Sequence, residues 1–153
     1  MRISTPAFED DERIPQKYTC DGKDISPKLK LADVPPESES LAIVVDDPDA
    51  PGGVFDHWVI WNIPPEIKEI PENVPMGKKV DSLEGASQGK NGFGEFGYRG
   101  PCPPPGPSHK YRFKLYALDR SINLAPGVLK EDLEREMEDY IIDRDSIIGI
   151  YGR

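Results

Sequence analysis

The chain has 153 residues, enough for one hydrophobic core, and we expect residues 1–153 to form a single domain. Its formal charge of −9 argues against sequence-independent nucleic-acid binding, because such binding needs Lys and Arg to neutralise phosphates. No apolar run approaches the ~18 residues that span a bilayer, and the N-terminus lacks the apolar core of a signal peptide, so we expect a cytoplasmic protein.

The first third of the chain predicts strands between turns. Residues 1–36 are rich in turn signals and leave room only for short strands. The apolar run 41–45 predicts a strand buried on both faces. Residues 47–53 are rich in Asp, Pro and Gly and predict a tight, rigid loop.

A second strand is predicted over residues 57–63. Residues 66–108 hold no long periodic segment, although their aromatic side chains favour an ordered loop. Residues 111–118 alternate between apolar and polar side chains at their start and predict the clearest strand.

The C-terminal part predicts one helix and one strand. Apolar side chains recur every three to four residues from Leu129 through Leu133 and Met137 to Tyr140 and Ile141, which predicts an amphipathic helix. Residues 147–151 predict a final strand. Seventeen prolines argue against a helical bundle, and the pattern predicts a mainly β sandwich or barrel with long Gly/Pro-rich loops. Frequent charges and scarce Asn and Gln are typical of thermophilic proteins.

Five polar residues stand where predicted loops meet predicted strands, the usual position of binding groups: Asp47, Asp49, His57, His109 and Tyr111. Alternation along an extended chain puts His109 and Tyr111 on one face. Each residue also has an ordinary structural interpretation. Asp-Pro-Asp forms turns by itself, a histidine at a strand end is usually structural, and a tyrosine can be a core aromatic.

Several kinds of site are disfavoured by the motifs. Two histidines and two carboxylates resemble a metal-ligand set, but no His-x-x-x-His or Cys-x-x-Cys spacing supports one, and we expect no metal or cofactor. No Gly-x-Ser-x-Gly elbow and no Gly-x-x-x-x-Gly-Lys phosphate loop occur.

Two longer blocks resemble the phosphatidylethanolamine-binding protein (PEBP) family, in its short bacterial and archaeal branch called Raf-kinase-inhibitor-like. One block is Asp-Pro-Asp-Ala-Pro at 47–51 followed by His-Trp-Val-Ile-Trp-Asn-Ile-Pro at 57–64. The other runs from 91–94 through Gly-Tyr-Arg-Gly-Pro-Cys-Pro-Pro at 97–104 to residues 109–119. Residues 14–22, 26–27 and 149–153 resemble the family more weakly. The resemblance implies an antiparallel β-sandwich with a small anion pocket at one end.

Carried over position by position, the family's pocket residues correspond to Asp47, Asp49, His57, Gly100, Pro101, His109 and Tyr111. The family usually has Arg after its second histidine, where this chain has Lys110. Lys keeps the charge but loses the planar fork of Arg. Alternation puts Lys110 on the face opposite His109, so we expect the pocket to be unaffected.

These residues predict a binding protein for phosphate or phosphoethanolamine-like groups. Imidazole N–H and tyrosine O–H groups donate to an anion, and the carboxylates either act through the histidines or receive an ammonium group. No activated nucleophile is recognisable, so an enzyme, such as a hydrolase using the Asp, His and Tyr cluster, is the less favoured hypothesis. The resemblance also suggests a homodimer, and serine protease or kinase inhibition through the loop 101–107 as the alternative function.

The two cysteines, Cys20 and Cys102, both lie in loops of the matching segments. They form either a disulfide or a pair of buried thiols. Intracellular disulfides are rare outside hyperthermophiles, so the composition favours the disulfide only weakly.

Overall fold

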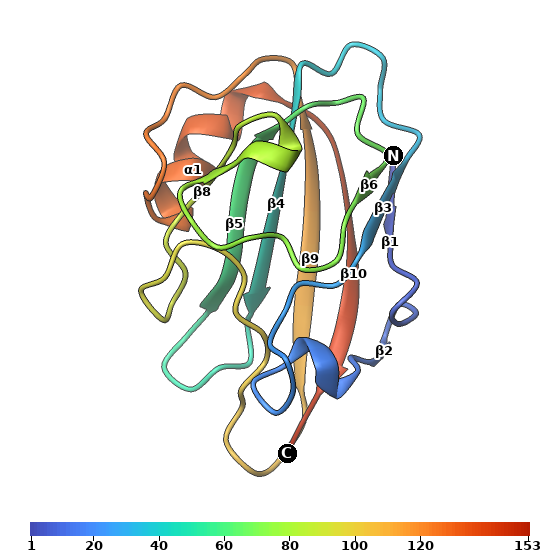
Figure 1. Ribbon diagram of the computed structural model, residues 1–153, viewed down its shortest axis with the longest axis vertical. Helices are drawn as coiled ribbons and strands as arrows, with labels where there is room; N and C mark the ends of the chain where they lie inside the picture. Colours follow the sequence, from blue (N-terminus) through green and yellow to red (C-terminus); the bar gives the residue numbers. More distant parts are fainter.

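Two β-sheets and one short helix make up the fold, which a computed structural model describes over residues 1–153 (Figure 1). The strands of the larger sheet are β2 (Glu12–Arg13), β4 (Ser40–Asp47), β5 (Phe55–Ile63), β7 (Lys79–Val80), β8 (Ala86–Gln88), β9 (His109–Leu118) and β10 (Ile141–Tyr151). The smaller sheet contains β1 (Arg2–Ser4), β3 (Leu29–Ala32) and β6 (Glu69–Ile70). The mainly β architecture expected from the sequence is confirmed.

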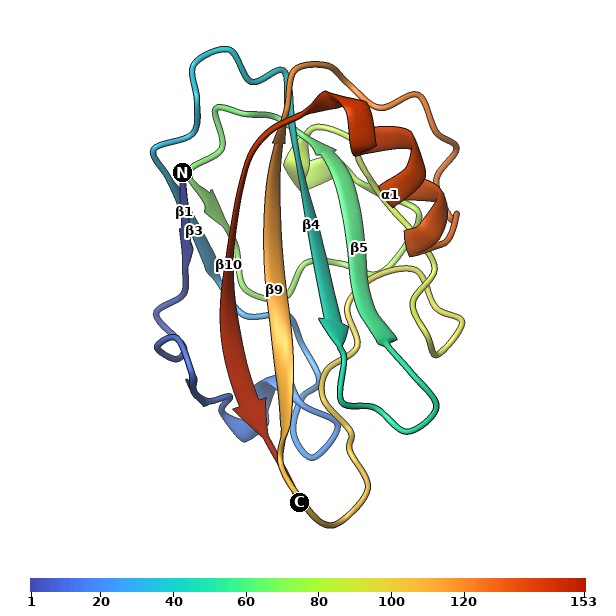
Figure 2. The same cartoon turned by 180° about the vertical axis from the view of Figure 1, so that it is seen from behind.

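The larger sheet has the strand order β2-β10-β9-β4-β5-β8-β7, and the smaller sheet has the order β1-β3-β6. All pairs are antiparallel except β2 with β10, which is parallel. Helix α1 (Lys130–Met137) packs on the face of the larger sheet opposite the smaller sheet, over β4 and β5 (Figure 2). The helix has eight residues, and no helix of the chain is long and apolar enough to cross a membrane.

Strand β4 explains why residues 41–45 are all apolar. Ile43 and Val45 face the core between the two sheets, whereas Ala42 and Val44 face the second core beneath α1. Both faces of the strand are therefore covered, and alternate side chains serve different cores. The predicted burial of residues 41–45 on both faces is confirmed.

The C-terminal helix is shorter than predicted, and the extension to Ile141 is wrong. Helix α1 ends at Met137, a 3-10 turn covers Glu138–Tyr140, and Ile141 begins β10. Tyr140 and Ile141 still pack on the core beneath the helix, so their spacing resembles a helical face although the chain is already turning. β10 is correspondingly longer than the predicted strand 147–151, because it pairs with β9 along its whole length.

The segment 66–108 contains three strands too short to show periodicity, β6, β7 and β8. Each has only two or three residues. The rest of this segment follows the edge of the sandwich and returns to the end of the sheet where β4 ends and where β5 and β9 begin (Figure 1). The C-terminus lies at the same end, beside the loop that leads into β9 (Figure 2).

Candidate functional site

A cavity of about 150 Å³ opens at this end of the larger sheet. It is lined by Asp47, Ala50, Pro51, Phe55, His57, Phe93, Cys102, Pro103, Pro104, His109 and Tyr111. A larger open groove of about 690 Å³ follows residues 30–34 and 65–69, but no histidine, tyrosine or cysteine lines it. The small cavity therefore holds the side chains suited to binding or chemistry.

Three neighbouring strands supply the polar walls of the cavity. Asp47 is the last residue of β4, His57 is the third residue of β5, and His109 and Tyr111 are the first and third residues of β9. Period-two alternation places His109 and Tyr111 on the cavity side, whereas Lys110 is exposed on the other side. The sequence therefore correctly placed Lys110 outside the pocket.

His109 is held by Asp47. Its Nδ1 atom lies 2.7 Å from Oδ2 of Asp47, and Oδ1 of the same carboxylate accepts the N–H of Asp49 at 2.8 Å. A carboxylate can only accept, so Nδ1 of His109 carries the hydrogen. In the neutral ring, Nε2 is then a bare acceptor.

His57 is held in the same way by a backbone carbonyl. Its Nδ1 lies 2.7 Å from the carbonyl oxygen of Arg99, which also can only accept. Burial lowers the pKa of His57 below 6.5, outweighing the hydrogen bond to Arg99 and the charge of Asp47. The ring is therefore neutral at pH 7. Neither His57 nor His109 has a protein partner at Nε2, and neither Nε2 is sealed off from solvent.

The ring of Tyr111 packs against both imidazoles. Its ring centroid is 5.3 Å from that of His57 and 6.3 Å from that of His109. Burial and the charge of Asp47 raise the pKa of Tyr111 well above its usual range, so the phenol keeps its proton. Its ring is also part of the main hydrophobic core, which fixes its position.

Aromatic side chains form one rim of the cavity. The rings of Phe55 and Phe93 pack edge to face at 4.8 Å, and Phe93 also lies 6.0 Å from His57. Phe93 is 48% exposed, which is unusual for a ring of this size. The pocket thus combines a polar floor with a partly apolar entrance.

Three of the predicted pocket residues do not line the cavity. Asp49 is exposed, and its carboxylate accepts the backbone N–H of Lys110 at 2.8 Å, which fastens the 48–54 loop to the start of β9. Pro101 accepts the N–H of Cys20 at 3.1 Å through its carbonyl oxygen. Asp49 and Pro101 therefore support the segments that form the cavity walls without lining the cavity themselves.

Gly100, the third of these residues, has no room for a side chain. A Cβ atom there would collide with the carbonyl oxygen of Tyr18, so the close approach is made by the chain itself. The N–H of Gly100 donates to Oδ1 of Asp24 at 2.6 Å. The glycine is required for packing against residues 18–24.

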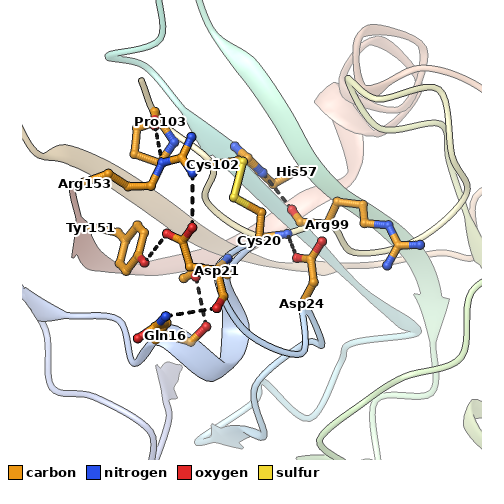
Figure 3. Close-up of a disulfide and its surroundings, with 12 residues drawn as sticks. Gln16, Cys20, Asp21, Asp24, His57, Arg99, Cys102, Pro103, Tyr151 and Arg153 are labelled. Atoms are coloured by element: carbon orange, nitrogen blue, oxygen red, sulfur yellow. Dashed lines mark hydrogen bonds and ion pairs between the residues drawn. A yellow bond between two sulfur atoms is a disulfide. The ribbon is translucent and has the colours of Figure 1, made fainter. Parts of the chain in front are cut away.

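A disulfide joins Cys20 to Cys102, and Cys102 itself lines the cavity (Figure 3). It links the N-terminal loop to the segment that carries Arg99 and Pro103. The C-terminus braces the same segment, because Nε of Arg153 donates to the carbonyl of Pro103 at 2.8 Å and Nη1 of Arg153 contacts Asp21. Sequence reasoning had left the pairing of the cysteines open.

Sequence reasoning missed two aromatic residues that line the pocket and two groups that support it from outside. Phe55 and Phe93 have a recognisable signal, since both are aromatic residues beside loops rich in Gly and Pro. The carbonyl of Arg99 and the carboxylate of Asp24 have no such signal. A backbone acceptor is invisible in a sequence, and Asp24 is far from His57 along the chain.

The chain is similar to proteins of one family along its whole length. A family model for phosphatidylethanolamine-binding protein matches residues 4–152. A UPF0098 protein of Methanothermobacter thermautotrophicus is 50% identical, covering 100% of this chain and 99% of the relative, and one of Pyrococcus abyssi is 49% identical, covering 100% and 85%.

Solved structures give the same result. A phosphatidylethanolamine-binding protein homologue of Chlamydia trachomatis superposes with a TM-score of 0.88 and 38% sequence identity, covering 99% of this chain and 96% of its own. YbcL of E. coli, described as a member of the mammalian PEBP family, has a TM-score of 0.90 and 29% identity, covering 99% and 98%.

Proposed function

Because the chain belongs to the phosphatidylethanolamine-binding protein family, we propose that it is a binding protein whose pocket takes a small anion, namely phosphate or a phosphoethanolamine-like group. The observation that carries this proposal is the pair of imidazoles at one cavity, each with Nδ1 engaged and Nε2 free. Tyr111, whose hydroxyl keeps its proton, packs beside both rings.

The hydrogen-bonding state of the imidazoles decides when an anion binds. A neutral ring with its hydrogen on Nδ1 offers only a lone pair to the cavity, which repels a fully ionised oxyanion. An imidazolium offers an N–H donor and a positive charge at the same atom. Anion binding therefore requires that a proton be taken up by an imidazole or carried in on the phosphate.

The carboxylate of Asp47 acts through His109. One of its oxygens accepts from His109 and the other from the N–H of Asp49, so part of its acceptor capacity is already used. The exposed ring of Phe93 at the entrance is a better place for the cation of phosphoethanolamine, because an ammonium is attracted to an aromatic face.

Calorimetric titration with phosphate and with phosphoethanolamine tests the proposal. The affinity should fall as the pH is raised from about 5 to about 8, because the pKa of His57 is lowered by burial and its cationic form is lost as the pH rises. Tyr111→Phe should weaken binding about fivefold or more, corresponding to one lost hydrogen bond, whereas Tyr116→Phe on the opposite face of β9 should not. Binding that does not change with pH would contradict the proposal, and product formation from phosphoethanolamine would indicate an enzyme.

Protease inhibition through residues 101–107 is the alternative function, and the rigidity of this loop favours it. Residues 104–108 are exposed, and the N–H of Gly106 donates to the carbonyl of Arg153 at 3.1 Å. A rigid exposed loop loses little conformational entropy when it binds a partner. Chymotrypsin-like and elastase-like proteases should be assayed with the natural protein and with His57→Ala. Inhibition that survives this substitution would assign the activity to the loop rather than to the pocket.

A further inference from the structure

One peptide group in the pocket wall is hydrogen-bonded at both of its ends. The carbonyl oxygen of Arg99 accepts Nδ1–H of His57 at 2.7 Å, and the N–H of the same peptide, which belongs to Gly100, donates to Oδ1 of Asp24 at 2.6 Å. Asp24, this peptide and His57 thus form one continuous chain of hydrogen bonds (Figure 3).

Hydrogen bonds in such a chain strengthen one another. A carboxylate that accepts from the peptide N–H draws the hydrogen towards itself and increases the negative charge on the peptide oxygen. That oxygen then becomes a better acceptor for Nδ1–H of His57. The negative charge of Asp24 also favours the positively charged form of the ring.

The arrangement matches that of the other histidine. His109 donates directly to Asp47 at 2.7 Å, whereas His57 reaches its carboxylate through one intervening peptide. We propose that Asp24 is a positioning residue for His57, holding the imidazole with its hydrogen on Nδ1 and favouring its cationic form. This proposal deepens the function proposed above, since its effect on ligand affinity rests on the pocket being an anion site.

Asp24 is itself firmly held. Its backbone is left-handed, with φ of 57°, and its N–H donates to the carbonyl of Lys17 at 3.1 Å. The neighbouring disulfide between Cys20 and Cys102 fastens this loop to the pocket wall. The carboxylate therefore faces the peptide after Arg99 in a fixed geometry rather than as a mobile surface charge.

Other charged or titratable groups also face His57. They come from β4, β5, β9 and the loop before residue 100: Asp47, Asp56, Arg99, His109 and Tyr111. Of these carboxylates, Asp47 and Asp56 act on His57 by charge, as does Asp24. Only Asp24 is hydrogen-bonded to the peptide whose carbonyl oxygen accepts Nδ1–H of His57.

The test is the pKa of His57 in the ligand-free protein, measured by NMR. The chain has only two histidines, so His109→Gln leaves one imidazole signal and identifies it. Asp24→Asn removes the charge, keeps an acceptor oxygen and suits the left-handed backbone. We expect the pKa of His57 to fall by about half a unit or more. Asp21→Asn is the matched control in the same loop, because Asp21 bonds Tyr151 and Arg153 instead, and it should leave the pKa of His57 unchanged.

An unchanged pKa of His57 in Asp24→Asn, or an equal fall in Asp21→Asn, would overturn the proposal. If Asp24→Asn does not fold, Asp24→Gly keeps the backbone conformation and removes the acceptor, and the same fall is expected. Calorimetry with inorganic phosphate separates this proposal from the function above. A lowered pKa with no phosphate binding by the natural protein would refute the anion site and leave the role of Asp24 intact.

Discussion

At the scale of single residues, the free Nε2 atoms of His57 and His109 define what the pocket offers a ligand. Both Nδ1 atoms face groups that can only accept, so both neutral rings must carry their hydrogen on Nδ1. We predict that nitrogen NMR above the titration range will show this tautomer for both histidines. A histidine with its hydrogen on Nε2 at high pH would contradict the hydrogen bonds to Arg99 and Asp47.

The lowered pKa of His57 also predicts how stability changes with pH. The unfolded chain titrates near 6.5, whereas burial keeps the folded ring neutral to lower pH. Between these two pKa values the unfolded state binds more protons, so the free energy of unfolding should fall as the pH drops below 6.5. Denaturant titrations of the natural protein and His57→Gln between about pH 6.5 and pH 5 check this, and the variant should show the flatter dependence. An equal slope in both proteins would contradict it.

At the scale of elements, side chains alternate between the two faces of strands β4, β5 and β9. One polar region therefore lies in the pocket and another on the helix side of the sheet. Asp47, His57 and Tyr111 face the pocket, while their neighbours Asp46, Asp56 and Arg112 face the helix side. Behind the pocket, the fully buried carboxylate of Asp46 lies 2.7 Å from Nε of Arg112, 2.8 Å from Nζ of Lys114 and 3.6 Å from Nζ of Lys130. Lys130 also contacts Asp56 and so attaches the start of α1 to the sheet.

This ion cluster should matter far more to stability than the surface ion pairs. Burial alone would raise the pKa of Asp46, but the hydrogen bonds from Arg112 and Lys114 hold it below its usual value. Asp46→Asn leaves three cations without their shared partner, and we expect a loss of about 3 kcal/mol in the free energy of unfolding. Glu69→Gln, which breaks an exposed contact with Lys28, should cost less than about 1 kcal/mol. Similar losses in both variants would show that the cluster contributes little.

The disulfide is the second feature at this scale that should stabilise the fold. Cys20 and Cys102 are 82 residues apart, and closing a loop of that length restricts the unfolded chain by about 4.5 kcal/mol in the chain-entropy model. The double variant Cys20→Ser, Cys102→Ser should therefore unfold at a lower denaturant concentration, and reductant should bring the natural protein to the same midpoint. Two reactive thiols in denatured, unreduced protein would refute the bond.

Some elements were predictable from the sequence and others were not, for identifiable reasons. Strands β4, β5 and β9 are long, and each contacts a core on both faces or a core on one face and the pocket on the other. Their sequences therefore show clear apolar runs or a clear alternation of apolar and polar side chains. β10 was recognised only at its end, because its first half carries Asp143 and Asp145, which bind the N-terminal ammonium and the N–H of Ile3. Those contacts join distant parts of the chain and leave no local pattern.

At the scale of the whole molecule, the second sheet was the least predictable feature. Its three strands have two to four residues each, and they become strands only because they cover the core face of the larger sheet. The polar pocket residues Asp47, His57, His109 and Tyr111 were predicted chiefly through the family resemblance, because each of them alone also has an ordinary structural interpretation. The supporting roles of Asp24, Asp49 and Gly100 depend on loops that meet only in the folded chain.

For the proposed anion pocket, the net charge of −9 predicts that a soluble ligand is favoured over a membrane surface. An anionic bilayer repels an acidic protein over about one Debye length, whereas a small soluble ligand diffuses into the pocket without bringing such a surface. We expect soluble phosphoethanolamine to bind, and sedimentation with vesicles rich in phosphatidylserine to leave the protein in the supernatant at physiological ionic strength. Vesicles of phosphatidylcholine, which carry no net charge, are the control. Stronger sedimentation with the anionic vesicles than with the neutral ones would show that a local surface outweighs the total charge.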